Sequence, residues 1–373
     1  MPSSTSSSDQ SCCPPQHAGV GREPTAPDGS TAERRQADEG ALPPHPWLCW
    51  ATALSVGLSL VLLAELAWRR AGIKPSIVDD RMLWSAQRER VDAQLSQQVV
   101  FIGSSRLQLG LVPDLFREAT GGWEPVQLAV DGAAPMATLR DIAAHSEFRG
   151  GVVFSLLPWC LLPELWRMQE EHVRFYNTQW NALTRLSRDL RSSLEQRVVA
   201  VNPHVNLLRV LPRLVRGEGV PTQFLFTHRD RWREAQYAVV PNIEQVAADR
   251  TTRSHAEFAA LQDSLSEANW VDLVARIDAF VDRIQDRGGW VVFLRCPSTG
   301  AVWDLEQEHF PRAHYWEVIV ENTTAVTIHF QDVPAMRELP CPDGSHLDAE
   351  HARLFTQALV EELTTRGLLT KKN

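Results

Sequence analysis

Short apolar segments rich in β-forming residues alternate with helical stretches along the chain from about residue 97 onward. Continuous apolar strands separated by helices are typical of a parallel sheet that is covered on both faces. The pattern therefore predicts an α/β fold with a doubly wound, mainly parallel sheet. Its five predicted strands are residues 99–102, 126–130, 152–157, 290–294 and 326–330.

Two later segments repeat apolar residues at spacings of three and four, which places these residues on one face of a helix. The first segment runs from Trp270 to Ile284, and the second runs from Ala352 to Leu363. We expect each segment to form a helix with one buried stripe.

An apolar run precedes the predicted sheet. Residues 47–64 carry no charge, and extending the run to Trp68 gives a helix of roughly 33 Å, which is long enough to span a bilayer. Tryptophans lie near both ends, and Arg69 and Arg70 follow the run. The alternatives are a buried core helix or the apolar stretch of a cleaved signal peptide. The run lacks the polar stripe of a core helix and starts far from Met1, so we predict one transmembrane anchor over residues 45–70 that contacts the membrane through residues 47–68.

The charges that flank the anchor bear on its orientation. The preceding residues carry three arginines, whereas the far flank carries Arg69, Arg70, Lys74 and Arg81. The positive-inside rule, taken literally, places the large domain in the cytoplasm. Large domains can translocate largely regardless of charge. We expect a single-pass membrane protein with an extracytoplasmic domain, although the flanking charges favour the opposite placement.

The remaining chain divides by composition. Residues 1–44 are rich in Ser, Pro and Gly with almost no bulky apolar side chains, which predicts a disordered tail. Residues 71–96 are expected to form a linker and a first helix, and residues 97–373 the α/β domain. An insertion of about residues 161–250 follows the third strand and is mostly helical in pattern. One interpretation is a helical excursion that is exposed to solvent. The other is a lid or a membrane-surface element, which is favoured by the mixture of leucines and arginines over residues 207–216.

Composition excludes several classes of partner. Lys and Arg total 37 against 46 Asp and Glu, a net charge of -9, so no global basic field attracts nucleic acid. The six cysteines show no metal-ligand spacing, and we predict neither a metal nor a cofactor. The number and spacing of the cysteines favour neither an oxidising nor a reducing compartment.

The first candidate motif is the segment FIGSSR at residues 101–106. A serine directly after a strand projects at the carboxyl edge of a sheet, and the preceding Gly103 permits the tight turn that exposes it. A simple turn or helix cap explains the same residues.

The second candidate motif is CPDGSHLD at residues 341–348, which precedes the last predicted helix. An Asp-x-x-His spacing on one tight turn lets the carboxylate of Asp343 orient the imidazole of His346, whose other nitrogen then faces a nucleophile. The alternative is an N-cap beside an incidental surface histidine. Asp348 is the expected N-cap of the helix.

The first motif follows the first strand of the predicted sheet, and the second precedes its last helix. In a doubly wound sheet these two points lie at the same edge. Over about residues 97–366 the sequence resembles the SGNH or GDSL hydrolases. The matching blocks are FIGSSR, the glycine-containing QLAVDGAAP and the final DGSHLDAEHARLFTQAL. With its N-terminal anchor and mid-chain insertion, the chain looks like the membrane-anchored members that add or remove acyl groups on cell-envelope polymers. The resemblance implies the flavodoxin-like fold of that superfamily.

The resemblance also implies residue roles. Ser105 would be the nucleophile, His346 the general base and Asp343 its orienter, while the backbone N–H groups of Ser105 and Gly132 would form the oxyanion hole. Ser104 is the competing nucleophile.

One block departs from the family's pattern. The third block of the family normally supplies an Asn that donates to the oxyanion, and the segment GGVVFSLLPWCLL contains none. Ser155, the Trp159 indole or Arg295 would have to fill that place, or the oxyanion hole is weaker. Arg106, Arg295 and Trp159 are candidate substrate-binding residues, the two arginines for an anionic group.

These observations predict a membrane-anchored serine esterase or O-acyltransferase that acts through an acyl-enzyme on acyl esters, acetyl esters first among them, of a glycan or cell-envelope component. Its partners would be this ester substrate and, for transfer, a membrane-bound acyl donor protein. The alternative is a catalytically silent binding or scaffold protein of an envelope polysaccharide system. A third reading is a cytosolic domain that acts on an intracellular ester.

Overall fold

The computed structural model describes residues 45–93, 97–202, 205, 207–220, 222–261 and 264–369. Contacts within the chain divide it into two compact units, Met1–Leu60 and Val61–Asn373. The predicted tail, residues 1–44, lies outside the described residues.

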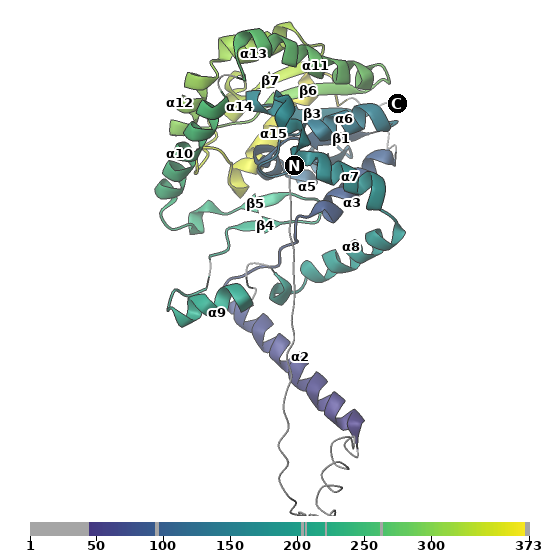
Figure 1. Ribbon diagram of the computed structural model, residues 1–373, viewed down its shortest axis with the longest axis vertical. Coiled ribbons are helices and arrows are strands. Elements are labelled where there is room, and N and C mark those ends of the chain that lie inside the picture. The colour runs from purple at the N-terminus through teal and green to yellow at the C-terminus, as the bar shows by residue number, and fades with distance from the viewer. Residues whose placement is uncertain are drawn as a thin grey trace, which may run out of the picture. The chain divides into compact units, whose positions relative to one another are not determined.

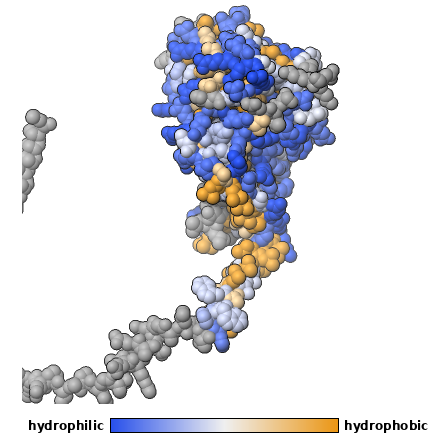
Figure 2. All heavy atoms as spheres, turned by 90° about the vertical axis from the view of Figure 1, so that its right-hand side faces the viewer, coloured by the Kyte–Doolittle hydropathy of each residue, from blue (hydrophilic) through white to orange (hydrophobic). Residues whose placement is uncertain are grey.

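The predicted anchor is a single continuous helix, α2, which runs from Pro46 to Arg70. None of its 25 residues is buried, and it is long and apolar enough to span a membrane. The orange surface of this helix in Figure 2 reflects that composition. Because its leucines, alanines and valines are interrupted by only a few polar residues, the helix has no polar stripe with which to pack in a water-soluble core.

The second unit is built on a sheet of five parallel strands in the order β2-β1-β3-β6-β7 (Figure 1). Numbered along the chain as first to fifth, this order is 2-1-3-4-5, which is that of a doubly wound sheet. The predicted five-stranded parallel sheet is confirmed. The strands are β1 (Gln98–Ile102), β2 (Glu124–Gln127), β3 (Gly151–Ser155), β6 (Trp290–Arg295) and β7 (Val326–His329).

The second strand ends three residues earlier than predicted. Regular pairing with β1 stops at Gln127, and beyond it only isolated bonds remain, from the N–H of Leu128 to Phe101 and from that of Val130 to Gly103. The apolar run 126–130 therefore continues as buried irregular chain rather than as strand.

Both faces of the sheet are buried, which is why its strands read as continuous apolar runs. In β1, Val100 and Ile102 enter one core cluster, while Val99 and Phe101 enter the other. Successive side chains of a strand point to opposite faces, so β1, β3 and β6 each contribute residues to both clusters.

Helices cover each face of the sheet (Figure 1). The stripe of α11 (Glu267–Gln285) from Trp270 to Ile284 is buried in the first cluster, and the stripe of α15 (Ala349–Thr365) is buried in the second, as the spacing predicts. The first cluster also takes residues from α3 (Arg81–Asp92), α6 (Met136–His145), α12 (Gly300–His309) and α13 (Arg312–Glu321). The second takes residues from α4 (Ser105–Gly110), α5 (Pro113–Ala119), η6 (Phe330–Asp332) and α14 (Pro334–Arg337).

The insertion after β3 is mostly helical, but it also contains an antiparallel pair of strands that the sequence did not reveal. β4 (Leu225–Thr227) and β5 (Arg233–Ala235) have three residues each, too few to display an alternating pattern. The other elements are η1 (Pro158–Leu161), η2 (Pro163–Gln169), α7 (Glu170–Gln179), α8 (Ala182–Glu195), η3 (Val199–Val201), α9 (Leu207–Val215), η5 (Tyr237–Val239) and α10 (Ile243–Leu261).

Candidate active site

The backbone places Ser105 at the carboxyl end of β1. The strand ends at Ile102, Ser104 is the N-cap of α4, and Ser105 is the first residue of that helix. Gly103 is required by close packing rather than by a left-handed turn. A Cβ there would lie 2.8 Å from the Cβ of Ser155 on β3, and Gly103 is not among the glycines with positive φ.

A tight turn before α15 brings Asp343 and His346 together. The Asp343 Oδ1 atom accepts hydrogen bonds from the backbone N–H groups of Ser345 (3.0 Å) and His346 (2.8 Å). Gly344 has φ 80°, which a glycine adopts without strain and which closes the turn. The carboxylate therefore holds its own loop, and its Oδ2 atom lies 2.8 Å from the imidazole Nδ1 of His346. Asp348 is the N-cap of α15, as expected.

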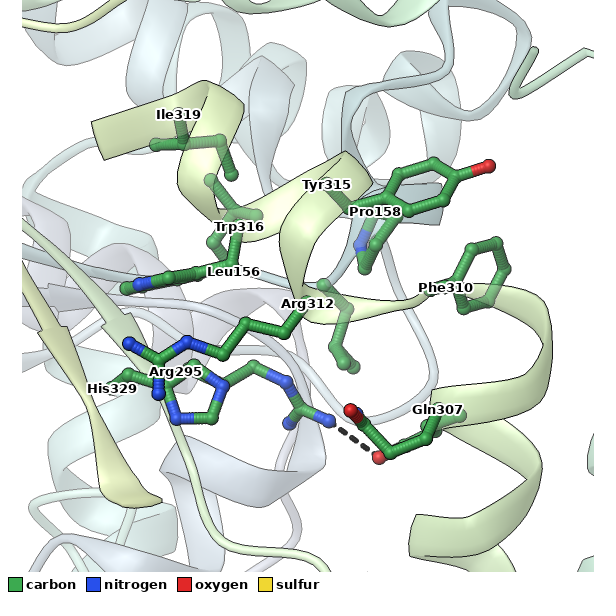
Figure 3. A pocket seen from close by; sticks show the side chains of 12 residues that line it. Leu156, Pro158, Arg295, Gln307, Phe310, Arg312, Tyr315, Trp316, Ile319 and His329 are labelled. Atoms are coloured by element: carbon green, nitrogen blue, oxygen red, sulfur yellow. Dashed lines mark hydrogen bonds and ion pairs between the residues drawn. The ribbon is translucent and has the colours of Figure 1, made fainter. Parts of the chain in front are cut away.

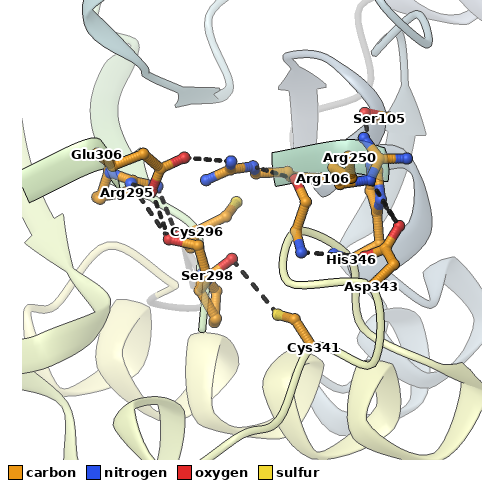
Figure 4. A network of polar contacts seen from close by, with 12 residues as sticks. Ser105, Arg106, Arg250, Arg295, Cys296, Ser298, Glu306, Cys341, Asp343 and His346 are labelled. Atoms are coloured by element: carbon orange, nitrogen blue, oxygen red, sulfur yellow. Dashed lines mark hydrogen bonds and ion pairs between the residues drawn. The ribbon is translucent and has the colours of Figure 1, made fainter. Parts of the chain in front are cut away.

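The two motifs meet at one edge of the sheet (Figure 4). The Nε2 atom of His346 lies 2.7 Å from the Oγ atom of Ser105, although the residues are 241 positions apart. With Asp343 on Nδ1, the imidazole is in the tautomer that accepts a proton from a hydroxyl. Within the described chain no hydrogen bond links Ser104 to this imidazole, so the geometry favours Ser105 over its neighbour.

Asp343 is surrounded by donors. The Tyr237 hydroxyl donates to Oδ2 at 3.0 Å, and the Arg250 Nε atom lies 3.0 Å from the same oxygen. Burial opposes ionisation of this carboxyl, but the hydrogen bond and charge of His346, the charge of Arg250 and the Ser345 N–H together lower the pKa of Asp343 well below its usual range. Asp343 is therefore a carboxylate at any ordinary pH.

The pKa of His346 is also lowered, but by a different cause. Burial disfavours the imidazolium and lowers the pKa of His346, outweighing the hydrogen bond and charge of Asp343, and Arg250 and Arg106 lower it further. The imidazole is thus neutral near pH 7 and able to take up a proton.

A buried ion network lies beside these residues (Figure 4). Glu306 of α12 pairs with both Arg106 of α4 and Arg295 of β6, and it accepts a hydrogen bond from Ser298 at 2.6 Å. Burial opposes the charge of Glu306, yet the two guanidinium groups lower the pKa of its carboxyl to about 2. Arg106 also donates from Nε to the Ser345 hydroxyl at 3.1 Å, which ties the network to the loop that carries His346.

Ser105 opens into a cavity of about 600 Å³. One part of its wall is apolar and the other is charged, since α10 contributes Arg250 and Arg253 as well as Phe258. Its lining residues come from the two motifs, from the turn after β2, from the chain after β3 and from α10: Ser104, Ser105, Arg106, Asp131, Gly132, Leu157, Trp159, Leu165, Met168, Arg250, Arg253, Ser254, Glu257, Phe258, Ala260, Leu261 and Ser345. The cavity is accordingly a candidate substrate site.

The predicted oxyanion-hole residue Gly132 lines this cavity with φ 66°, in a turn after β2. Of the three residues considered in place of the missing Asn, Trp159 alone also lines it. The Ser155 hydroxyl lies 3.3 Å from the Cys296 thiol under Gly103. Arg295 is held by Glu306.

Arg295 instead lies on the wall of a second, smaller cavity of about 30 Å³ (Figure 3). His329 of β7 faces the same space, and burial together with the charges of Arg295 and Arg312 lowers its pKa to about 3. Arg106 does line the cavity beside Ser105, but its guanidinium is committed to Glu306 and Ser345. Of the two arginines that the sequence suggested for an anionic group, only Arg106 therefore lines the cavity beside Ser105, and both are held by the buried Glu306.

Three residues of this site were missed by sequence reasoning. Tyr237 and Arg250 come from the insertion and its end, and Glu306 comes from α12. None lies in a recognisable motif, and each is placed by tertiary packing. The one available signal was the size of the insertion, which places its residues at the carboxyl edge of the sheet.

Over the described residues, no group of three or more His, Cys, Asp or Glu side chains is arranged to hold a metal ion. Comparison of the chain with protein-family models and with curated proteins finds no match.

Replacing Glu306 with Gln is expected to destabilise the protein strongly. The substitution leaves two buried guanidinium groups without a carboxylate, and breaking a buried ion pair costs about 3–5 kcal/mol. Thermal unfolding of the full chain in detergent measures the loss. The matched control is Glu338→Gln, because Glu338 is exposed and its pair with Arg337 is worth at most about 1 kcal/mol. Equal stability of the two variants would show that the network is not a stabilising unit.

Proposed function

We propose that the chain is a membrane-anchored serine esterase or O-acyltransferase of the SGNH type. The observation that supports this most strongly is the hydrogen-bonded series Ser105, His346 and Asp343, whose Ser105 lines a cavity. The sequence blocks at 101–106 and 341–348 resemble those of SGNH hydrolases and supply these three residues. Residue identity and spatial arrangement therefore favour the same chemistry.

The proposed reaction begins with attack of the Ser105 oxygen on the carbonyl carbon of an acyl ester. The hydroxyl proton passes to the His346 Nε2 atom, and the imidazolium is stabilised by Asp343. The carbonyl oxygen becomes an oxyanion, for which the backbone N–H groups of Ser105 and Gly132 are the proposed donors. The intermediate then expels the alcohol, which takes the proton from His346, and an acyl-serine remains.

A second attack releases the acyl group. Water gives a carboxylic acid, whereas a sugar hydroxyl gives a new ester, and in either case His346 removes the proton and returns it to Ser105. Esterase and transferase share the same residues up to this step. The apolar wall of the cavity, with Leu157, Trp159 and Phe258, supports a site for an acyl group and its carrier.

The proposed substrate is an acyl ester, chiefly an acetyl ester, of a glycan or another envelope component. The exposed apolar helix α2 supports a membrane location, and an anchored domain acts on material at that membrane. We place the domain outside the cytoplasm. A membrane-bound acyl donor protein is the proposed partner of the transferase.

A catalytically silent binding protein is the second candidate. The missing third-block Asn favours it, and so does the Ser155 hydroxyl, which contacts Cys296. Such a protein would bind an ester in the same cavity without hydrolysing or transferring its acyl group.

Turnover of a small acetyl ester by the full chain in detergent separates the two candidates. Ser105→Ala removes the nucleophile and His346→Ala removes the base, and each is expected to lower the rate by a factor on the order of 10⁴. Ser104→Ala keeps the nucleophile and is expected to keep turnover. Equal rates in the unaltered chain and in the Ser105 and His346 variants would rule out the enzyme.

The pH profile tests the electrostatic account of His346. Activity requires the neutral imidazole, so it falls as the pH drops through the pKa of His346, which burial sets below the ordinary value of about 6.5. Arg250→Met removes a positive charge that disfavours the imidazolium. We expect the pKa of His346 to rise and the acidic limb to move to higher pH in the profile of kcat/KM.

The matched control for that shift is Arg253→Met, which removes an equal charge from the same helix and the same cavity wall. Its limb is expected to move less, because Arg250 and not Arg253 is paired with Asp343. If the acidic limb of the Arg250→Met variant stays in place or moves to lower pH, the proposed role of this charge is contradicted.

A further inference from the structure

Helix α8 is packed with its charged face inward. Arg188, Ser192 and Glu195 are 1%, 1% and 3% exposed. Arg188 pairs with Glu195, donates to the Ser192 hydroxyl at 2.9 Å and lies 3.2 Å from Asp80, which belongs to the segment after α2. Polar contacts therefore attach this helix to the domain.

The opposite face of α8 is apolar and uncovered. Leu183, Leu186, Leu190 and Leu194 are 75%, 56%, 65% and 50% exposed. At about 100° per residue these four leucines form one stripe, on the side of the helix opposite Arg188, Ser192 and Glu195. Figure 2 looks at this side of the molecule and shows orange side chains gathered over α8. This polarity is the reverse of what water selects in a surface helix, so the stripe requires an apolar environment.

The chain that follows the stripe contacts the last turns of the apolar helix α2. Directly after α8, the carbonyl of Arg197 accepts a hydrogen bond from Arg69 at 2.7 Å, and the N–H of Ala200 donates to Glu65 at 2.8 Å. Trp68 of α2 packs against the small cluster of Ile73, Val199 and Val205. The chain that leaves α8 is thus fastened to the last turns of α2, where that helix would leave the bilayer.

Helix α9 also carries exposed apolar residues. Leu211 and Val215 lie four positions apart, on one helix face, and are 60% and 80% exposed. Arg209 and Arg213 are the basic residues of this helix, and Arg216 follows it. Leucines and arginines in such an arrangement are typical of helices that lie in a membrane interface.

We propose that α8 is a membrane-surface helix, whose leucine stripe enters the lipid headgroup and acyl boundary of the bilayer that α2 spans. The inference rests on the part of the proposed function in which α2 crosses the membrane. Lipid is then the apolar phase nearest to the stripe, because the segment after α8 is fastened to the end of α2. The domain is held against the membrane by two elements, α2 and α8.

Lipid-borne quenching of a site-specific fluorophore tests this contact in the full chain. Cys12, Cys13 and Cys49 are replaced with Ser, and one cysteine is introduced at a time: Leu190→Cys on the stripe, Leu58→Cys in α2, and Leu354→Cys as a matched exposed leucine of α15. Each labelled protein is reconstituted in vesicles of phosphatidylcholine and phosphatidylglycerol that contain a nitroxide-labelled phosphatidylcholine. Leu186→Cys repeats the stripe measurement at a second exposed position.

We expect the labels at Leu58 and at both stripe positions to lose most of their fluorescence, while the label at Leu354 keeps it. Quenching at Leu58 without quenching at either stripe position would overturn the inference and leave the anchor intact, whether water or another protein molecule covers the stripe. No quenching at Leu58 or on the stripe would overturn the anchor as well. Ester turnover does not enter this measurement, so failure of the proposed chemistry is distinguished from failure of the membrane contact.

Discussion

The hydrogen bond between the Ser105 hydroxyl and the His346 imidazole is the contact on which the site depends. It joins the end of β1 to the turn before α15, across 241 positions, at a distance of 2.7 Å. In the sheet β1 lies between β2 and β3, and α15 packs on one face, so the carboxyl end of β1 and the turn before α15 meet at one edge. Gly103 lets β1 approach Ser155 of β3 at this point, so the packing of the sheet and the placement of the hydroxyl are a single constraint.

The charges around this contact are arranged in two layers. The first is Asp343, which is held by its own turn, by His346 and by Tyr237, and which lies 3.0 Å from Arg250. The second is Glu306 with its two arginines, one of which binds the loop of His346 through Ser345. Burial keeps the imidazole neutral while these positive charges keep both carboxyls ionised. The result is a base that is free to accept a proton and an orienting group that does not compete for it.

The sequence was informative where the signal is local. Five apolar runs predicted the sheet, because a strand that is buried on both faces is visible in the sequence as a continuous apolar segment. The short spacing from Asp343 to His346 predicted their contact. Tyr237, Arg250 and Glu306 could not be found in this way, because each reaches the site from an insertion or a helix whose direction is fixed by tertiary packing. The strands β4 and β5 were missed because three residues show no alternation. The reversed polarity of α8 is likewise invisible in a sequence, which shows that a helix is amphipathic but not which face it buries.

Covalent capture of the nucleophile tests the central claim most directly. A fluorophosphonate reacts with a serine whose hydroxyl proton is removed by a neighbouring base: the oxygen bonds to phosphorus, fluoride leaves and the imidazole takes the proton. Mass spectrometry of the digested full chain locates the adduct. The account predicts a phosphonylated Ser105, an unmodified Ser104 and no adduct in His346→Ala. An unmodified Ser105 in the folded protein, or equal labelling when His346 is absent, would contradict it.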